Sequence, residues 1–92
     1  MYSELDARLS DFLLACKRYS DVNRFAVWVY YAISRYICSG RASADFCRRF
    51  LSYPEENFDK LIDYALRCGG SDNDILRQLN RAFKYKPDEA AS

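Results

Sequence analysis

Three basic residues near the carboxyl end of this 92-residue chain have the type and spacing best suited to binding chemistry. Arg77, Arg81 and Lys84 recur at intervals of four and three residues, which places them on one face of a helix. No acidic residue stands four positions before Arg77 or Arg81, so local ion pairing does not explain them. This basic stripe (Arg77, Arg81 and Lys84) predicts an anionic partner, either an acidic protein surface or a nucleic-acid backbone. The alternative is a solvated face near a helix end, where the helix dipole favours cations.

A second candidate surface lies on the segment 22–38, where nearly every position is apolar or aromatic. On a helix, its one polar strip carries Arg24, Val27, Tyr31 and Arg35. Val27 and Tyr31 stand one turn apart between arginines, and tyrosine with arginine is typical of binding hot spots. The strip therefore predicts a face for a protein partner, or a seam between two copies of the chain. The alternative is that a neighbouring part of the chain covers Val27 and Tyr31.

The rest of this segment is predicted to be the core of the fold. A helix that is apolar around most of its circumference has to be wrapped by other elements. Because the run does not alternate, a helix is favoured over a strand in spite of its β-branched and aromatic residues. The arc assigned to the core contains Val22, Phe25, Ala26, Trp28, Val29, Tyr30, Ala32, Ile33, Tyr36 and Ile37.

One stretch has the spacing of a helix-turn-helix motif. Ala65 is followed by Gly69 after four residues and by Ile75 after six more, as in a tightly packed helix pair joined by a turn. The second helix would begin with Ser-Asp-Asn-Asp (71–74), whose carboxylates would repel phosphates. A plain helical hairpin is therefore favoured, and a DNA-binding regulator that uses residues 61–84 is the alternative.

Side chains for catalysis are scarce. The chain has no histidine, which is the commonest general base, and no glycine-rich phosphate loop. Its acidic residues fall on predicted helix starts and solvent faces, where capping explains them. We therefore predict a protein that is not an enzyme, with no catalytic residue and no cofactor.

The four cysteines are predicted to be reduced and mostly buried. They form no Cys-x-x-Cys pair, so a metal site is not expected. A disulfide is the alternative, and Cys38 and Cys47, on either side of the turn at Gly40, are its best candidates.

Helix signals divide the chain into five segments. Each is opened by a capping residue, namely Ser3, Ser20-Asp21, Ser43, Ser52 and Ser71. The helices are expected at about 4–18, 21–38, 44–51, 54–67 and 72–84. The predicted fold is all-α, a compact bundle of four to five short helices packed around the central hydrophobic helix (about 21–38). Residues 1–84 are expected to form a single helical domain, and 85–92 a flexible carboxyl-terminal tail.

Charge and hydropathy restrict the setting of the protein. The net charge of +1 gives no global attraction to nucleic acid or to an anionic membrane. The segment 22–38 is short for a membrane span and contains Arg24 and Arg35. Because the amino terminus lacks a basic leader followed by an apolar run, a cytoplasmic location is expected.

Together these features predict a small non-enzymatic interaction module. We expect a regulator or inhibitor that binds a larger protein or nucleoprotein assembly through the Tyr/Arg face and the basic stripe. A protein partner is expected, a nucleic-acid partner through the basic stripe and a homodimer are the alternatives, and no membrane is involved.

Overall fold

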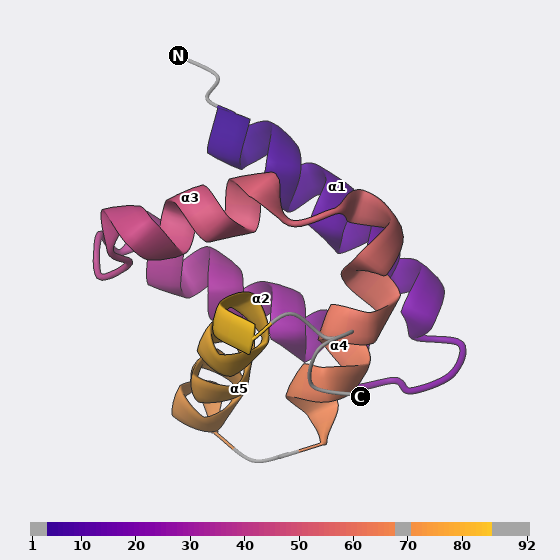
Figure 1. Ribbon diagram of the computed structural model, residues 1–92. Helices are drawn as coiled ribbons and strands as arrows, with labels where there is room; N and C mark the ends of the chain where they lie inside the picture. The colour runs from indigo at the N-terminus through magenta and orange to yellow at the C-terminus, as the bar shows by residue number, and fades with distance from the viewer. Residues whose placement is uncertain (1–3, 68–70, 86–92) are drawn as a thin grey trace.

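The computed structural model describes residues 4–67 and 71–85, and this part of the chain is an all-α bundle, as predicted. Five α-helices and one 3-10 turn make up its regular structure. They are α1 (Glu4–Tyr19), α2 (Ala26–Cys38), α3 (Ala44–Ser52), η1 (Glu55–Asn57), α4 (Phe58–Leu66) and α5 (Asp72–Tyr85) (Figure 1).

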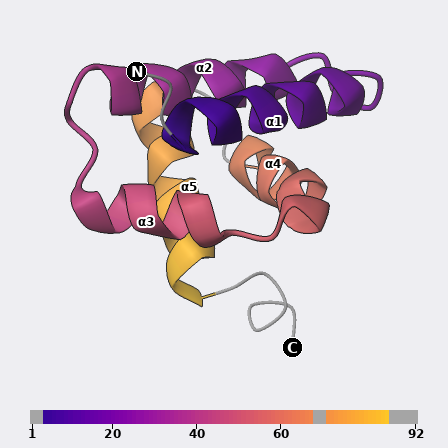
Figure 2. The ribbon, with the colours of Figure 1, turned by 90° about the horizontal axis from the view of Figure 1, so that it is seen from above.

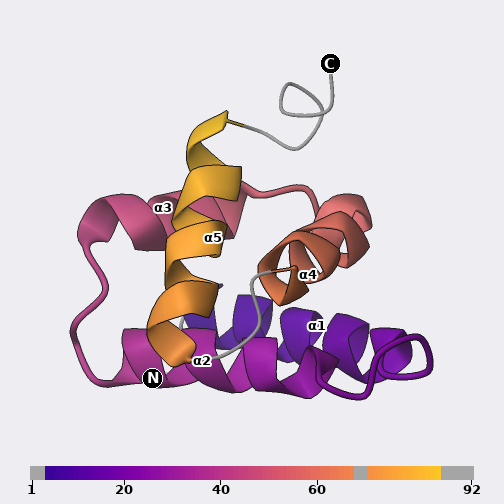
Figure 3. The same ribbon diagram turned by 90° about the horizontal axis from the view of Figure 1, so that it is seen from below.

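The helices lie in two groups. α1 and α2 run antiparallel, side by side, and α3, α4 and α5 all lie on one side of this pair (Figure 2). α5 starts next to α2 and crosses to the level of α3 (Figure 3). One face of the α1–α2 pair is therefore packed against the other three helices, and none of the described helices lies over its opposite face.

Aromatic side chains fill the space between the two groups. The Phe12 ring of α1 meets the rings of Phe50 and Phe58 edge to face, with centroids 5.6 and 5.0 Å apart. Phe46 and Phe83 form a similar pair at 5.2 Å. All five rings are buried, and such edge-to-face contacts add to the stabilisation that burial gives. The core therefore joins α1, α3, α4 and α5 through rings.

The start of α2 differs from the prediction. The helix begins at Ala26, and Asn23 Oδ1 accepts a hydrogen bond from the Phe25 amide at 2.9 Å, which holds the turn before it. The cap predicted at Ser20-Asp21 is wrong. Ser20 Oγ donates to a carbonyl in the last turn of α1, so this serine closes one helix and does not open the next.

Two serines around α3 have different roles. Ser43 caps α3 as predicted, because its Oγ accepts a hydrogen bond from the Phe46 amide at 3.0 Å. Ser52 was expected to cap the next helix, and that prediction is wrong. Its Oγ donates to the Arg48 carbonyl within α3, and α4 begins only at Phe58, after η1.

The start of α5 follows the prediction. Ser71 Oγ accepts a hydrogen bond from the Asp74 amide at 3.3 Å, and Asp74 Oδ2 in turn accepts from the Ser71 amide at 3.4 Å. Tyr85 belongs to α5 and not to the predicted tail. The cap predicted at Ser3 and the rest of the tail, 86–92, lie outside the described residues.

None of the described helices is long and apolar enough to cross a bilayer.

Candidate partner-binding surfaces

The two faces of α2 are both apolar, but only one is buried. Its inner face consists of buried residues of small to moderate size, namely Ala26, Val29, Ala32 and Ile33. Its outer face and the turn before it expose larger side chains. Val22 is 77% exposed, Phe25 47%, Trp28 58% and Tyr31 51%. Within the described residues, Leu14 is the one other large apolar side chain with comparable exposure.

This arrangement corrects part of the predicted core. Val22, Phe25 and Trp28 were assigned to the buried arc, and that assignment is wrong. A helix that is apolar all round has no contrast between its faces, so its sequence does not say which face points inward. Small side chains on the inner face let α2 approach its neighbours closely, which leaves the larger rings outside.

The exposed residues stand at every third position of the chain. We call Val22, Phe25, Trp28 and Tyr31, which recur every three residues, the α2 stripe. The Phe25 and Trp28 rings contact each other edge to face with centroids 6.0 Å apart. The Arg24 guanidinium lies over the Phe25 ring at 5.0 Å. The stripe thus combines aromatic rings with a cation at one end.

The structure distributes the predicted Tyr/Arg face unevenly. Arg24, Tyr31 and Arg35 are exposed as expected, whereas Val27 is half-buried. Tyr31 belongs to the α2 stripe, and its ring contacts the Tyr30 ring with centroids 5.5 Å apart. Arg35 has a structural partner, because its guanidinium is 2.5 Å from Asp72 at the start of α5.

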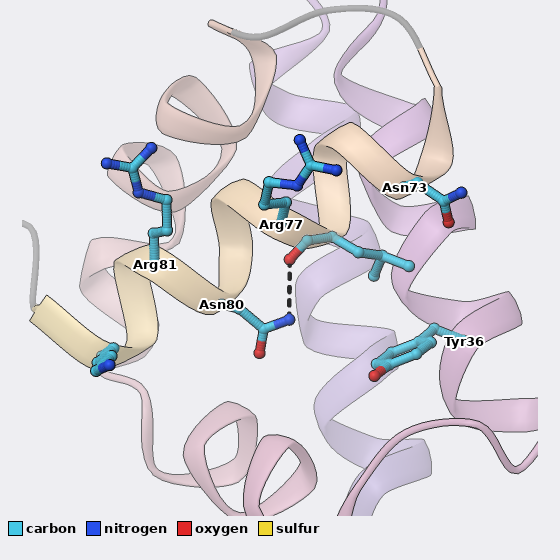
Figure 4. Close-up of a pocket in the computed structure, with 7 residues that line it drawn as sticks. Tyr36, Asn73, Arg77, Asn80 and Arg81 are labelled. Carbon is cyan, nitrogen blue, oxygen red and sulfur yellow. Dashed lines mark hydrogen bonds between the residues drawn. The ribbon is translucent and has the colours of Figure 1, made fainter.

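The basic stripe lies along a groove between α2 and α5. The groove has a volume of about 540 Å³, and Arg77, Arg81 and Lys84 all line it. Arg77 and Arg81 project from successive turns of α5 toward the same side, while Tyr36 is contributed by α2 (Figure 4). The structure therefore brings together all three residues of the predicted basic stripe.

The floor of this α2–α5 groove is partly apolar. Tyr36 and Leu76 line it, and Asn80 Nδ2 donates to the Leu76 carbonyl at 3.1 Å (Figure 4). The Tyr36 ring packs edge to face on Phe46 with centroids 5.0 Å apart, and the Arg41 guanidinium lies 5.5 Å from its centre. Arg41 therefore places a fourth cation next to the groove.

Acidic residues stand at the amino-terminal end of this surface. Asp74 is 3.9 Å from the Arg77 guanidinium, and both side chains are well exposed, so the attraction is weak. Within the described part of the chain, Arg81 forms no ion pair. The described side chains that line the groove include no carboxylate.

The candidate helix-turn-helix corresponds to α4 and α5, which pack against each other. Ala65 and Ile75 are both buried, as that motif requires, but a plain hairpin requires the same. Gly69 lies outside the described residues. The first turn of α5 presents Asp72 and Asp74, and these carboxylates stand where a recognition helix would first meet phosphates.

The described cysteines are free thiols with very different surroundings. Cys16 is buried, Cys47 is half-buried and Cys38 is exposed, so the prediction that the thiols are mostly buried is wrong for Cys38 and Cys47. The alternative, a Cys38–Cys47 disulfide, is not formed. Burial raises the pKa of Cys16 to about 12, against a smaller opposing effect of a hydrogen bond with the Tyr30 backbone. In the described part of the chain, no three histidine, cysteine or acidic side chains gather as metal ligands would.

In the described part of the chain, Tyr19 and Asp45 also have a shifted pKa. Desolvation and a hydrogen bond to the Asp63 carboxylate raise the pKa of Tyr19. The same hydrogen bond joins α1 to α4. The Arg49 guanidinium holds the pKa of Asp45 below its usual value, which favours the carboxylate in the first turn of α3.

Comparisons of the chain with family models, with curated proteins and with solved structures find no match. The function proposed for the chain therefore rests on the geometry of the α2 stripe and the α2–α5 groove.

Several residues of these surfaces were not identified from the sequence. Phe25 and Trp28 were hidden by the uniform hydropathy of their helix. Asn73 and Asn80 were not considered, although each lies four residues before a cation of the basic stripe and lines the same groove. This spacing was the signal that could have identified them.

Proposed function

We propose that this chain is a non-enzymatic protein-interaction module, a regulator or inhibitor that docks on a larger protein or nucleoprotein assembly through the α2 stripe. The observation that carries the proposal is the exposure of Phe25, Trp28 and Tyr31 along one helix face. Soluble proteins rarely leave neighbouring large rings in water unless a partner covers them. Tryptophan, tyrosine and arginine are also the residues that dominate binding energy at interfaces.

The charges around the stripe indicate what the partner offers. Arg24 stands beside Phe25, and Arg35 lies one turn beyond Tyr31. An apolar patch with the Arg24 guanidinium at one end, and with Arg35 already paired to Asp72 at the other, fits a partner with an apolar recess and an acidic residue near Arg24. The complementary charges would set the orientation of docking, and the rings would supply most of the affinity.

The composition of the chain supports a role without catalysis. It has no histidine, and the buried Cys16 thiol has a pKa far above neutrality, so that thiol is not an activated nucleophile. The described part of the chain has no buried polar or charged side chain at its core. These features suit a rigid scaffold that presents a surface.

The first test of this proposal is capture of a partner from the host by the immobilised protein. The expected partner is retained by the parent and lost with Trp28→Ser and Tyr31→Ser. Leu14→Ser is the matched control, because Leu14 is an equally exposed apolar side chain outside the stripe. Purified partner should then protect Trp28, the one tryptophan of the chain, from acrylamide quenching. Capture of the same proteins by the parent and by both stripe variants would contradict the proposal.

A second copy of the chain is the competing occupant of the stripe. Light scattering across micromolar concentrations separates the two cases. We expect a monomer at all concentrations, whereas a dimer that Trp28→Ser dissociates would assign the stripe to self-association.

A further inference from the structure

We propose that the α2–α5 groove binds an acidic segment of polypeptide in which carboxylates flank an apolar side chain. The groove is lined by residues other than those of the α2 stripe, so each surface can be tested with its own variants. Beyond the basic stripe seen in the sequence, the proposed site includes the groove floor and specifies the ligand.

The wall of the groove carries the charge that such a ligand needs. Arg77 and Arg81 point the same way from successive turns of α5, and Lys84 follows one turn later. Arg81 has no ion pair in the described structure, and the carboxylate paired with Arg77 is 3.9 Å away. Two guanidinium groups held one turn apart on a rigid helix are ready to receive carboxylates, which arginine binds with paired hydrogen bonds.

The floor of the groove joins the apolar Tyr36 ring and Leu76 with the amides of Asn73 and Asn80. Arg41 stands against the Tyr36 ring. A groove of about 540 Å³ lies in the range that accommodates a peptide side chain with its neighbours. A ligand with one leucine or phenylalanine between carboxylates would therefore meet apolar surface at its centre and cations at its sides.

The surroundings of the groove favour a peptide over a nucleic acid. A polyanion carries a charge at every step, and the carboxylates of Asp72 and Asp74 at the start of α5 would oppose it. A base would also have to stack on Tyr36, whose ring already contacts Arg41 and Phe46. A peptide avoids both problems, because its carboxylates can be placed only where the groove has cations.

The test is a fluorescence anisotropy titration of the full chain with labelled peptides. Glu-Glu-Leu-Phe-Glu-Glu is the probe, and it should bind more tightly than both Gln-Gln-Leu-Phe-Gln-Gln and Glu-Glu-Ser-Ser-Glu-Glu. Arg77→Glu and Arg81→Glu should each weaken binding roughly tenfold or more, because a charge-assisted hydrogen bond is replaced by repulsion. Arg18→Glu on α1 is the control with the same change in net charge, and should leave affinity within about twofold.

The outcomes distinguish a peptide groove from a nonspecific basic surface and from a nucleic-acid site. Equal losses for Arg81→Glu and Arg18→Glu, or equal binding of the glutamate and glutamine peptides, would overturn the proposal. A labelled DNA duplex that binds more tightly than the peptide and is released by Arg81→Glu would assign the groove to nucleic acid and overturn it too. Arg81→Gln, which should weaken binding in the same direction, covers the case in which Arg81→Glu is unstable. The Trp28→Ser variant should bind the probe with the affinity of the parent. The titration therefore tests the groove even if the α2 stripe does not bind a partner.

Discussion

The inner and outer faces of α2 both carry apolar or aromatic residues, but only the inner face is buried. The inner face carries Ala26, Val29 and Ala32, which are buried, and the outer face carries Trp28 and Tyr31, which are exposed. Burial along α2 follows size and fit, because small residues allow neighbouring helices to approach closely. The largest apolar side chains of a small domain can therefore be surface groups, and their exposure then needs a cause outside the core.

Removing one ring from the core and one from the outer face of α2 should produce the largest difference in the free energy of unfolding. Phe58 lies in the core against Phe12 and Phe50, and Phe58→Ala should lower the free energy of unfolding by about 3–5 kcal/mol. Trp28→Ala makes the same kind of change on the outer face and should cost about 0.5 kcal/mol or less. Urea denaturation followed by circular dichroism measures both. Comparable losses would show that the outer ring also holds the fold together.

Adjacent residues give a second version of the same contrast. Ala32 is buried and Tyr31 is exposed, although they are neighbours in α2. Ala32→Leu should destabilise the fold by about 1–3 kcal/mol because the added atoms have no space on the inner face. Tyr31→Leu keeps an apolar side chain in water and should change stability little. Thermal melts would decide, and a neutral Ala32→Leu would contradict the packing described for that face.

The thiols extend the contrast between buried and exposed groups. Since iodoacetamide reacts with the thiolate, Cys38 should be alkylated first, Cys47 next and Cys16 last in the folded protein. Mass spectrometry of a Cys68→Ser background gives the order.

The raised pKa of Cys16 also determines how the stability of the fold depends on pH. Its neutral thiol is favoured by the fold, so stability is intact below the ordinary pKa of 9.0 and declines as pH rises toward about 12. Rapid alkylation of Cys16 at neutral pH would contradict its burial.

The smallest expected effect concerns Arg35, which was predicted for docking and is found in an ion pair with Asp72. Both side chains are well exposed, so Arg35→Ala should cost about 0.2–1 kcal/mol at low salt and less at high salt. Stability measured at two salt concentrations tests this. A loss that salt leaves unchanged would mean that Arg35 contributes through packing.

The amphipathic helices were predictable because each has one apolar face. Ile75, Leu76 and Leu79 of α5, for example, have the spacing of one helix face and are buried together. The serine caps of α3 and α5 were also predictable, because serine is a favoured amino-terminal cap, and each of these two accepts a hydrogen bond from the amide three residues later.

The start of α2, the start of α4 and the outer face of α2 were not predictable in the same way. Ser20 and Ser52 have the residue type of an amino-terminal cap, but each donates to the helix that precedes it. The orientation of α2 depends on which residues of other helices fit against it, which is a property of the whole fold. The same reason hid the groove, because Tyr36 and Arg81 line one groove only when α2 and α5 are packed.

The role of the α2 stripe as a docking surface can be measured at Trp28, by acrylamide quenching in the isolated protein and in its complex. As the one tryptophan, it reports on the stripe alone. The isolated chain should show the red-shifted emission and efficient quenching of an indole in water, and the complex with the captured partner should show a blue shift and protection. Emission that is already blue-shifted and protected in the isolated monomer, or that does not change in the complex, would contradict docking through the stripe.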